Sequence, residues 1–246
     1  MLIALMADIH ANREAFAACL AHAREHGAER HVFLGDYVGY GADPAWVVET
    51  VMQHVASGST AILGNHDHAI GEPRETMNPN AQIAIQWTRG QLSPSARSFL
   101  DHLPVHAEEG DRLYVHADGR IPQQWRYVTD RDDAARCFEG HAAQWIFCGH
   151  VHVPALFGIT ATHKLLHFQP VAGVPVPLSP QRRWLAVLGS VGQPRDGNAA
   201  SSYALLDLAK NELTYMRVAY DIERAAAKIR DAGLPEALAH RLSLGR

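Results

Sequence analysis

Cysteine is scarce in this chain of 246 residues. The three cysteines, Cys19, Cys137 and Cys148, are widely spaced, and each has apolar neighbours. An odd number of cysteines at such spacings does not suggest a disulfide framework. We therefore expect buried free thiols in a reducing cytoplasm, with a metal or redox role as the alternative.

Long apolar runs and basic clusters are also missing. Residues 1–7 are apolar but short and lack a positive leader, so they predict a strand rather than a signal peptide. No run approaches the length of a membrane span, and a formal net charge of −4 indicates no nucleic-acid surface. We expect a cytoplasmic protein without a membrane segment, and a homo-oligomer remains open.

The composition that is present is that of a globular protein. The chain is 47% hydrophobic and 20% charged, with no internal repeat, low-complexity tract or linker. We expect a single domain over residues 1–246.

The first part of the chain alternates between strands and helices. Apolar runs predict strands at 1–7, 31–34 and 60–63, and capping residues predict helices at about 12–26 and 43–56. This order is typical of parallel βαβ units. Polar residues follow each strand at its carboxyl end, where open α/β sheets bind their ligands.

The rhythm then changes. Asn78-Pro79 and Ser93-Pro94 predict helix starts, with helices at 79–91 and 94–102 in an insertion over 68–103 near the mouth of a site. A hairpin at 105–115, a helix to about 139 and a strand at 145–148 follow.

The second half contains short strands and turns. We expect strands at 155–160, 164–169, 184–188, 203–208 and 213–218, which would form an antiparallel second sheet packed on the first. Helices at 221–232 and 235–242 would form a C-terminal pair within 221–246.

Polar side chains that can bind metal ions recur just after the strands. They are carboxylates, imidazoles and one amide, which suit hard or borderline divalent metals: Asp8, His10, Asp36, Asn65, His66, His116, His150 and His152. In an extended segment, residues two apart face the same side, so Asp8 and His10, and likewise His150 and His152, would face one cavity. The two oxygens of Asp36 would allow it to bridge two metals.

The run Gly64-Asn65-His66-Asp67 has the most suggestive chemistry. Asn65 offers a neutral oxygen ligand, His66 titrates near neutrality, and Asp67 could orient the imidazole. Taken alone, these four residues could equally form a polar turn after a strand.

Together these motifs resemble the calcineurin-like metallophosphoesterases. The motifs are Asp-x-His, Gly-Asp-x-x-Gly, Gly-Asn-His-Asp, a lone His and Gly-His-x-His, in that order over residues 2–218. Tyr40-Gly41 and the run from Gly189 to Arg195 are similar to small prokaryotic members near the YfcE-type phosphodiesterases and diadenosine-tetraphosphatase relatives.

The resemblance implies a fold and a ligand set. The fold would be a four-layer α/β/β/α sandwich of two mixed sheets. The metals would be two divalent ions (Mn, Fe, Zn, Ni or Mg, with Mn favoured). One metal would be held by Asp8, His10, Asp36 and His152, and the other by Asp36, Asn65, His116 and His150.

The implied reaction is hydrolysis of a small phosphoester by a metal-activated water. His66 would be the catalytic imidazole, oriented by Asp67, and Asn65 and Arg195 would bind the phosphate. For Arg195, a surface salt bridge is the alternative. Rival functions are a phosphoprotein phosphatase, a dinucleoside polyphosphate hydrolase and, from another class, a non-catalytic scaffold that has kept the fold.

Charge favours a diester over a monoester. Two divalent ions supply about four positive charges, which Asp8, Asp36 and a bound hydroxide offset to leave about one in excess. None of the three lysines is beside a ligand motif, and Asp118 adds a negative charge near His116, so Arg195 is the cation we expect to help.

Overall fold

The structure, a computed structural model, describes residues 1–72 and 77–246, and its strands form two six-stranded sheets. The first sheet has the order β3-β2-β1-β11-β12-β9, with bounds Thr60–Ala61, Arg30–Phe33, Leu2–Met6, Ser201–Asp207, Glu212–Val218 and Pro175–Pro177. The second has the order β4-β5-β6-β10-β7-β8, with bounds His106–Glu109, Arg112–Val115, Trp145–Cys148, Arg182–Val187, Ala155–Thr160 and Leu165–Phe168.

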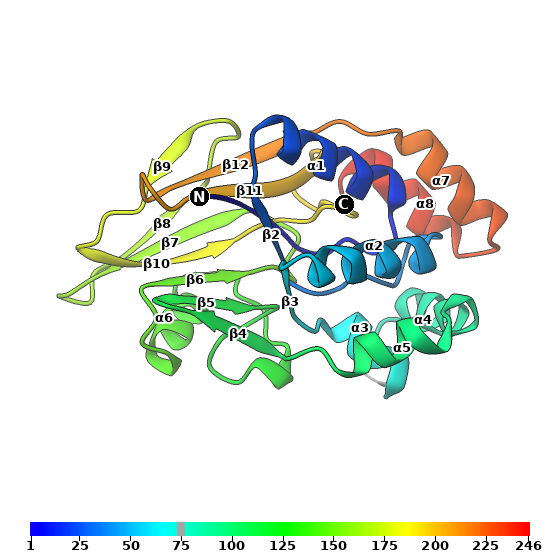
Figure 1. Cartoon of the computed structure of the whole chain (residues 1–246), viewed down its shortest axis with the longest axis horizontal. Helices are drawn as coiled ribbons and strands as arrows, with labels where there is room; N and C mark the ends of the chain where they lie inside the picture. Colours follow the sequence, from blue (N-terminus) through cyan, green and yellow to red (C-terminus); the bar gives the residue numbers. More distant parts are fainter. Residues whose placement is uncertain (73–76) are drawn as a thin grey trace.

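Both sheets are mixed. In the first, β1, β2 and β3 are parallel, while β11 runs antiparallel to β1. In the second, β5, β6 and β10 are parallel, while β7 runs antiparallel to β10. The parallel strands place their carboxyl ends at one end of the molecule, and the helical end of Figure 1 lies beyond them.

Alternate side chains of the strands build separate layers. In β1, Ala4 and Met6 pack with helices α1 (Arg13–Glu25) and α2 (Pro44–Ala56), whereas Ile3 and Leu5 pack with the second sheet. Helix α6 (Arg131–Gly140) covers the other side of the second sheet through Phe138. The result is the predicted α/β/β/α sandwich, which is therefore confirmed (Figure 1).

Most helix starts follow the predicted caps. The side chains of Asn12, Asn78 and Ser93 each accept a hydrogen bond from a backbone N–H of the first turn. Asp43 also precedes its helix, but its carboxylate accepts from Lys228 Nζ at 2.7 Å instead of capping α2. The start of α2 thus depends on Pro44 and on the contact between Asp43 and Lys228, which is far along the chain.

The remaining helices gather at the carboxyl ends of the strands. They are α3 (Asn65–Gly71), α4 (Pro79–Gln91), α5 (Pro94–Asp101), α7 (Ile222–Asp231) and α8 (Glu236–Leu244). A cluster containing Tyr40, Ala84 and Leu238 packs α4 against α7 and α8. Residues 73–76 of the insertion predicted over 68–103 lie outside the described residues.

Two expectations about elements are wrong. The strands of the second half do not form one antiparallel sheet, because β9, β11 and β12 join the first sheet and β10 pairs in parallel with β6. The segment after β3 is not a turn, because helix α3 begins at Asn65. The short strand β9 and a 3-10 helix at Pro122–Gln124 had no clear signal in the sequence.

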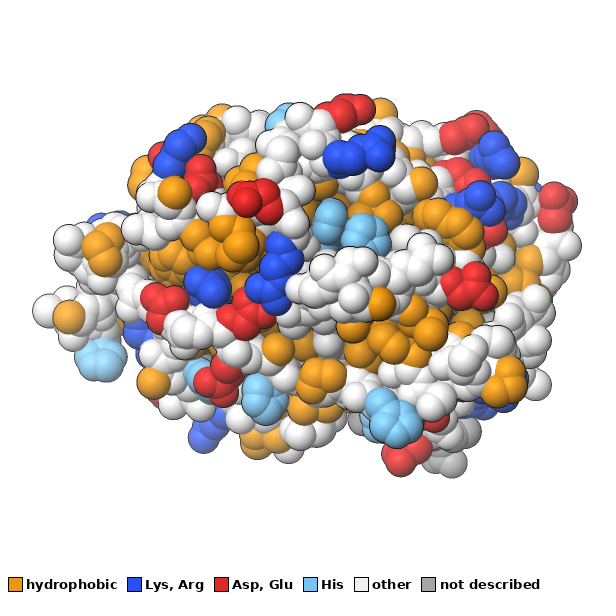
Figure 2. Space-filling model, viewed as in Figure 1, with side chains coloured by type: hydrophobic (Ala, Val, Ile, Leu, Met, Phe, Trp, Pro, Cys, Tyr) orange, Lys and Arg blue, Asp and Glu red, His pale blue; other side chains and the backbone are white. Residues whose placement is uncertain are grey.

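Among the described residues, no helix is long and apolar enough to cross a membrane. The three cysteines are buried and free. On the face shown in Figure 2, acidic and basic side chains are interspersed rather than gathered in a stripe of one sign.

Candidate metal centre

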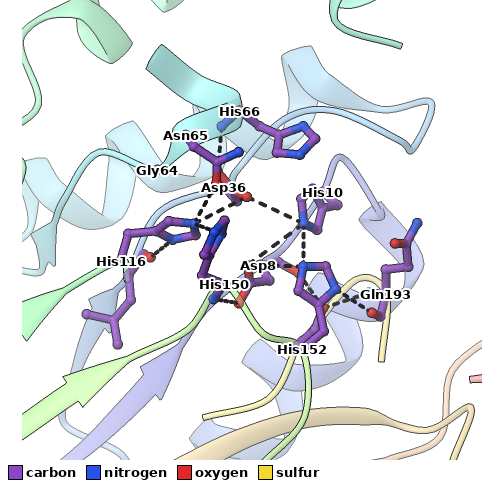
Figure 3. A network of polar contacts seen from close by, with 12 residues as sticks. Asp8, His10, Asp36, Gly64, Asn65, His66, His116, His150, His152 and Gln193 are labelled. Carbon is purple, nitrogen blue, oxygen red and sulfur yellow. Dashed lines mark hydrogen bonds and ion pairs between the residues drawn. The ribbon is translucent and has the colours of Figure 1, made fainter. Parts of the chain in front are cut away.

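The loops after five strands bring the predicted ligand residues together. Asp8 and His10 follow β1, Asp36 follows β2, Asn65 follows β3, His116 follows β5, and His150 and His152 follow β6. In Figure 3 their side chains converge on one space. All seven are buried except Asn65, which is partly exposed.

The first group of ligand atoms comprises Asp8, His10 and His152. The Nε2 atoms of the two histidines are 3.1 Å apart, and Asp8 Oδ1 lies 3.3 Å from His152 Nε2 and 3.9 Å from His10 Nε2. Asp8 Oδ2 accepts from the His150 backbone N–H at 2.8 Å, whereas the buried Oδ1 has no hydrogen-bond partner. That oxygen is free to bind a cation.

The second group comprises Asp36, His116 and His150, with Asn65 beside them. His116 Nε2 lies 3.0 Å from Asn65 Oδ1, 3.2 Å from His150 Nδ1 and 3.4 Å from Asp36 Oδ2. Asp36 Oδ2 is also 3.7 Å from His10 Nε2. The carboxylate of Asp36 therefore lies between the two groups, as a bridging ligand would.

Backbone carbonyl groups fix the tautomers of three histidines. The Nδ1 atoms of His10, His116 and His152 lie 3.1, 2.7 and 2.7 Å from the carbonyl oxygens of Val38, Leu34 and Gln193. Each ring must donate its Nδ1 proton to such a carbonyl, so in the neutral form each Nε2 presents a lone pair. Lone pairs that face one another at about 3 Å repel unless a cation or a proton lies between them.

Burial and neighbouring charges set the protonation state of each of these histidines. Burial lowers the pKa of His150 to about 3 and that of His10 well below its usual range, so both rings are neutral. Burial also opposes protonation of His116, but the charge of Asp36 outweighs it and raises the pKa of His116 to about 9. Oxygen and nitrogen donors without a thiolate fit two divalent ions of the hard or borderline kind.

The backbone that presents these ligands is not extended. Asp8, His10, Asp36, His150 and His152 all have left-handed φ values, between 50° and 68°. The ligand pairs do converge, but the expected reason, alternation along an extended segment, is wrong. A left-handed φ costs a non-glycine residue of the order of 1 kcal/mol, and such strain gathers at functional sites.

His66 lies beside these two groups, and one of its ring nitrogens is within 4.8 Å of ligand atoms of both His10 and Asp36. Its ring is 4.9 Å from that of His10 and 4.6 Å from that of Tyr40, and burial lowers its pKa to about 4. A Cβ added to Gly39, whose φ is +84°, would lie 2.3 Å from His66 Nδ1. The second glycine of the Gly-Asp-x-x-Gly motif therefore makes room for this imidazole.

Asp67 does not orient His66. One oxygen accepts from the N–H groups of Asp36 and Gly64 at 2.7 and 3.0 Å, and the other from Tyr37 and Val38 at 2.9 and 3.2 Å. Among the described residues no hydrogen bond joins Asp67 to His66, whose Nδ1 is buried without a partner. The carboxylate instead fixes the loop that carries Asp36.

An open cleft leads to the ligand groups. Its lining includes the predicted residues Asp36, Asn65, His66, His150, His152 and Arg195, and residues Met77, Asn78 and Ala81 at the start of α4. Arg195 donates to Gln193 Oε1 at 2.9 Å and forms no ion pair with a described acidic side chain, so the salt-bridge alternative fails for the described residues. Asp118 is absent from the lining, because its carboxylate accepts from the Arg120 N–H and lies near Cys137.

Two aromatic residues of the cleft were missed by sequence reasoning. Tyr127 stacks on His150 with ring centroids 4.2 Å apart and remains 52% exposed, and Trp125 packs at 5.8 Å from the ring of His116. They lie in an irregular segment with no periodic pattern, so only a spatial neighbour marks them. Tyr40 also lines the cleft.

This fold and this set of ligands define a metal-binding α/β protein of the phosphoesterase kind. The calcineurin-like phosphoesterase superfamily domain matches residues 1–211, and the chain belongs to that superfamily. The family predicted from the motifs is therefore confirmed.

Two relatives match along the whole chain. An uncharacterized protein from Methanocaldococcus jannaschii, MJ0912, is 35% identical over 251 residues, covering 100% of this chain and 98% of the relative. A metallophosphoesterase from Sphaerobacter thermophilus has a crystal structure with a TM-score of 0.89 and 35% identity, covering 100% of this chain and 99% of that one.

A second similar structure shows the fold alone. The hypothetical protein PH1004 from Pyrococcus horikoshii OT3 has a TM-score of 0.79 at 18% identity, with 100% of this chain and 98% of that one covered.

Proposed function

We propose that this protein is a dinuclear metal-dependent hydrolase that cleaves phosphodiesters in preference to phosphomonoesters. The observation that carries the proposal is the position of Asp36, whose Oδ2 lies 3.4 Å from His116 Nε2 and 3.7 Å from His10 Nε2. Two groups of ligand atoms that share one carboxylate suit a pair of metals.

The ligand sets follow from these groups. Asp8, His10, Asp36 and His152 would hold one ion, and Asp36, Asn65, His116 and His150 the other. When bound, the two ions would activate a water for attack on phosphorus and offset charge on the phosphate oxygens. Manganese is the favoured metal in this proposal, because oxygen and imidazole ligands without sulfur suit it.

The protein's own side chains would position the substrate. Arg195 lines the cleft, and its guanidinium keeps N–H groups for phosphate oxygens. The Asn65 side chain lies at the same opening and would also contact the phosphate. Small cleft-bound phosphoesters are the proposed substrates.

His66 would move the proton at the leaving oxygen. Its ring lines the cleft and is neutral when the site is free, because burial lowers its pKa to about 4. The negative charge of a bound phosphate would raise that pKa, so that the ring can donate its proton or a hydrogen bond to the leaving oxygen. Asp67 would support this step only indirectly, by holding the Asp36 loop.

Metal reconstitution tests the proposal. The protein loaded with Mn²⁺ should hydrolyse bis(p-nitrophenyl) phosphate, contain about two metal ions per chain by elemental analysis, and lose activity on chelation. Activity that survives chelation in a protein without tightly held metal would overturn it. We propose the cytoplasm as the location, since the buried cysteines are free thiols.

A further inference from the structure

A second open hollow lies between α4 and α8. Asn78 lines both the hollow and the cleft, and the hollow is completed by Pro79 and Asn80 of α4 and by Ala237, Leu238 and Arg241 of α8. The two spaces are therefore neighbours at the start of α4. Helix α8 lies beyond residues 1–211, the part of the chain that matches the superfamily domain.

Two guanidinium groups lie near the ring of Tyr40. The Cζ atoms of Arg195 and Arg241 lie 5.7 and 6.0 Å from the centre of the Tyr40 ring. Arg195 lines the cleft, whereas Arg241 lines the hollow. The Tyr40 ring also contacts His66, so it has Arg241 and His66 as common neighbours.

Neither arginine has a counter-charge among the described acidic side chains. Arg241 donates its Nε proton at 2.6 Å to the main-chain oxygen of Arg246, the last residue given, and Arg195 donates from Nε and Nη2 to Gln193 Oε1. Burial and the charge of Arg195 both lower the pKa of Arg241. Two cations that act on each other and have N–H groups to spare favour the binding of an anion.

The start of α4 adds to the positive potential. Asn78 caps this helix and Pro79 is its first residue, so the positive end of its dipole borders the hollow. The anion that would occupy the hollow is not the scissile phosphate, because Arg241 is not part of the cleft lining. A second anionic group on the same substrate would reach it.

We propose that Arg241 binds a second phosphate of the substrate, so that the preferred substrates are phosphodiesters bearing an additional phosphate group. This inference rests on the proposed hydrolase function. It assigns to the C-terminal helix pair a part in substrate selection, through a residue of α8 that acts beside the metal centre.

A matched pair of substrates tests the subsite. Thymidine 5′-(p-nitrophenyl phosphate) and the same compound with a 3′-phosphate share the scissile bond and the leaving group. With the Mn²⁺-loaded enzyme, the compound with the 3′-phosphate should have the higher kcat/KM. The Arg241→Gln variant should lower the ratio of the two kcat/KM values by about 10- to 100-fold, mainly through KM, as loss of a charge-assisted contact predicts. Arg241→Lys should restore part of it.

Arg230→Gln provides the matched control. It removes the same charge from the same helix pair, where Arg230 forms an exposed pair with Glu236, and should leave the ratio unchanged. A wild-type ratio near one, or a ratio that Arg241→Gln does not change, would overturn the subsite while leaving the hydrolase intact.

A binding measurement separates the two proposals. Calorimetric titration with thymidine 3′,5′-bisphosphate should show binding that Arg241→Gln weakens about tenfold or more. If neither diester is hydrolysed, the proposed function fails, and this titration still decides the subsite. Equal binding by the wild type and the variant would refute it.

Discussion

At the scale of single residues, Asp36 has the strongest predicted effect on metal content. Its carboxylate lies near both groups of ligand atoms, and its other oxygen accepts from the His66 N–H at 2.8 Å. In Asp36→Asn, one of those oxygens becomes an amide nitrogen and the charge is lost. We expect this variant to retain less metal than single substitutions of Asn65 or His150, as measured by elemental analysis after gel filtration. Equal metal loss in all three would argue against a shared ligand.

His66 should separate chemistry from metal binding. Its ring lies against His10 and Tyr40, and one ring nitrogen is within 4.8 Å of ligand atoms of His10 and Asp36. We expect His66→Ala to lower kcat by roughly 10²–10⁴-fold, the usual contribution of a general acid, with metal content near that of the wild type. A variant that loses its metals instead would identify His66 as a ligand.

At the scale of elements, Asp67 ties the start of α3 to the loop after β2. It satisfies four backbone N–H groups of Asp36, Tyr37, Val38 and Gly64. Asp67→Asn keeps the shape but replaces an accepting oxygen with a donor, leaving about two N–H groups unsatisfied. We expect a loss of roughly 2–4 kcal/mol of unfolding free energy, together with weaker metal retention.

Urea unfolding of metal-free and metal-loaded protein measures this loss. The exposed Asp111→Asn, at the turn between β4 and β5, serves as the control and should unfold like the wild type. If Asp67→Asn instead lowers kcat as much as His66→Ala does and leaves the stability unchanged, the result would support the orienting role that the sequence suggested for Asp67.

These elements also show what the sequence can predict. Helix starts can be predicted from the local sequence, because Asn12, Asn78 and Ser93 each cap the helix that follows. The alternation of strands and helices predicts the parallel part of the first sheet. Sheet membership is not local. The pairing of β1 with β11 joins Leu2 to Asp207 across nearly the whole chain, and no periodicity specifies it.

The candidate site divides in the same way. Residue types and their order along the chain identify the ligand residues, because each follows a strand. Two features depend on loops that pack against one another. They are the left-handed backbone of Asp8 and Asp36 and the hydrogen bonds that the Asp67 carboxylate accepts. Tyr127 and Arg241 enter only through tertiary packing, which a single sequence does not reveal.

At the scale of the whole molecule, buried histidines should make stability depend on pH. Burial and the neighbouring His54 lower the pKa of His31 in β2 to about 4, whereas an unfolded histidine titrates near 6.5. Between these values the unfolded chain binds more protons than the folded one, so stability falls as pH drops from about 6.5 to 4. Allowing for the partial exposure of His31, we expect it to contribute about 1–2 kcal/mol to this loss.

Urea midpoints at pH 7 and pH 5 measure the effect. His31→Phe, which keeps a ring stacked near Phe33, should reduce the difference between the two midpoints. His102→Phe, at the exposed end of α5, should keep the wild-type difference. If His31→Phe keeps the wild-type difference between the two urea midpoints, groups other than His31 cause the loss of stability at low pH.

The balance of charge around the cleft leads to the last prediction, the preference for diesters. Two divalent ions would supply about four positive charges, against the carboxylates of Asp8 and Asp36 and the hydroxide that the proposed reaction requires, which leaves an excess of about one. The small excess suits a diester monoanion better than a monoester dianion. Arg195 is the described cation that lines the cleft, because Arg241 lies beyond Tyr40 and no lysine is part of the lining. A monoester should therefore depend on Arg195 more than a diester does.

We expect kcat/KM to be higher for bis(p-nitrophenyl) phosphate than for p-nitrophenyl phosphate, and Arg195→Ala to lower the monoester value by the larger factor. Arg24→Ala, which removes a charge from the exposed face of α1, should change neither. If the enzyme prefers the monoester and Arg195→Ala preserves that preference, then charge does not set its selectivity.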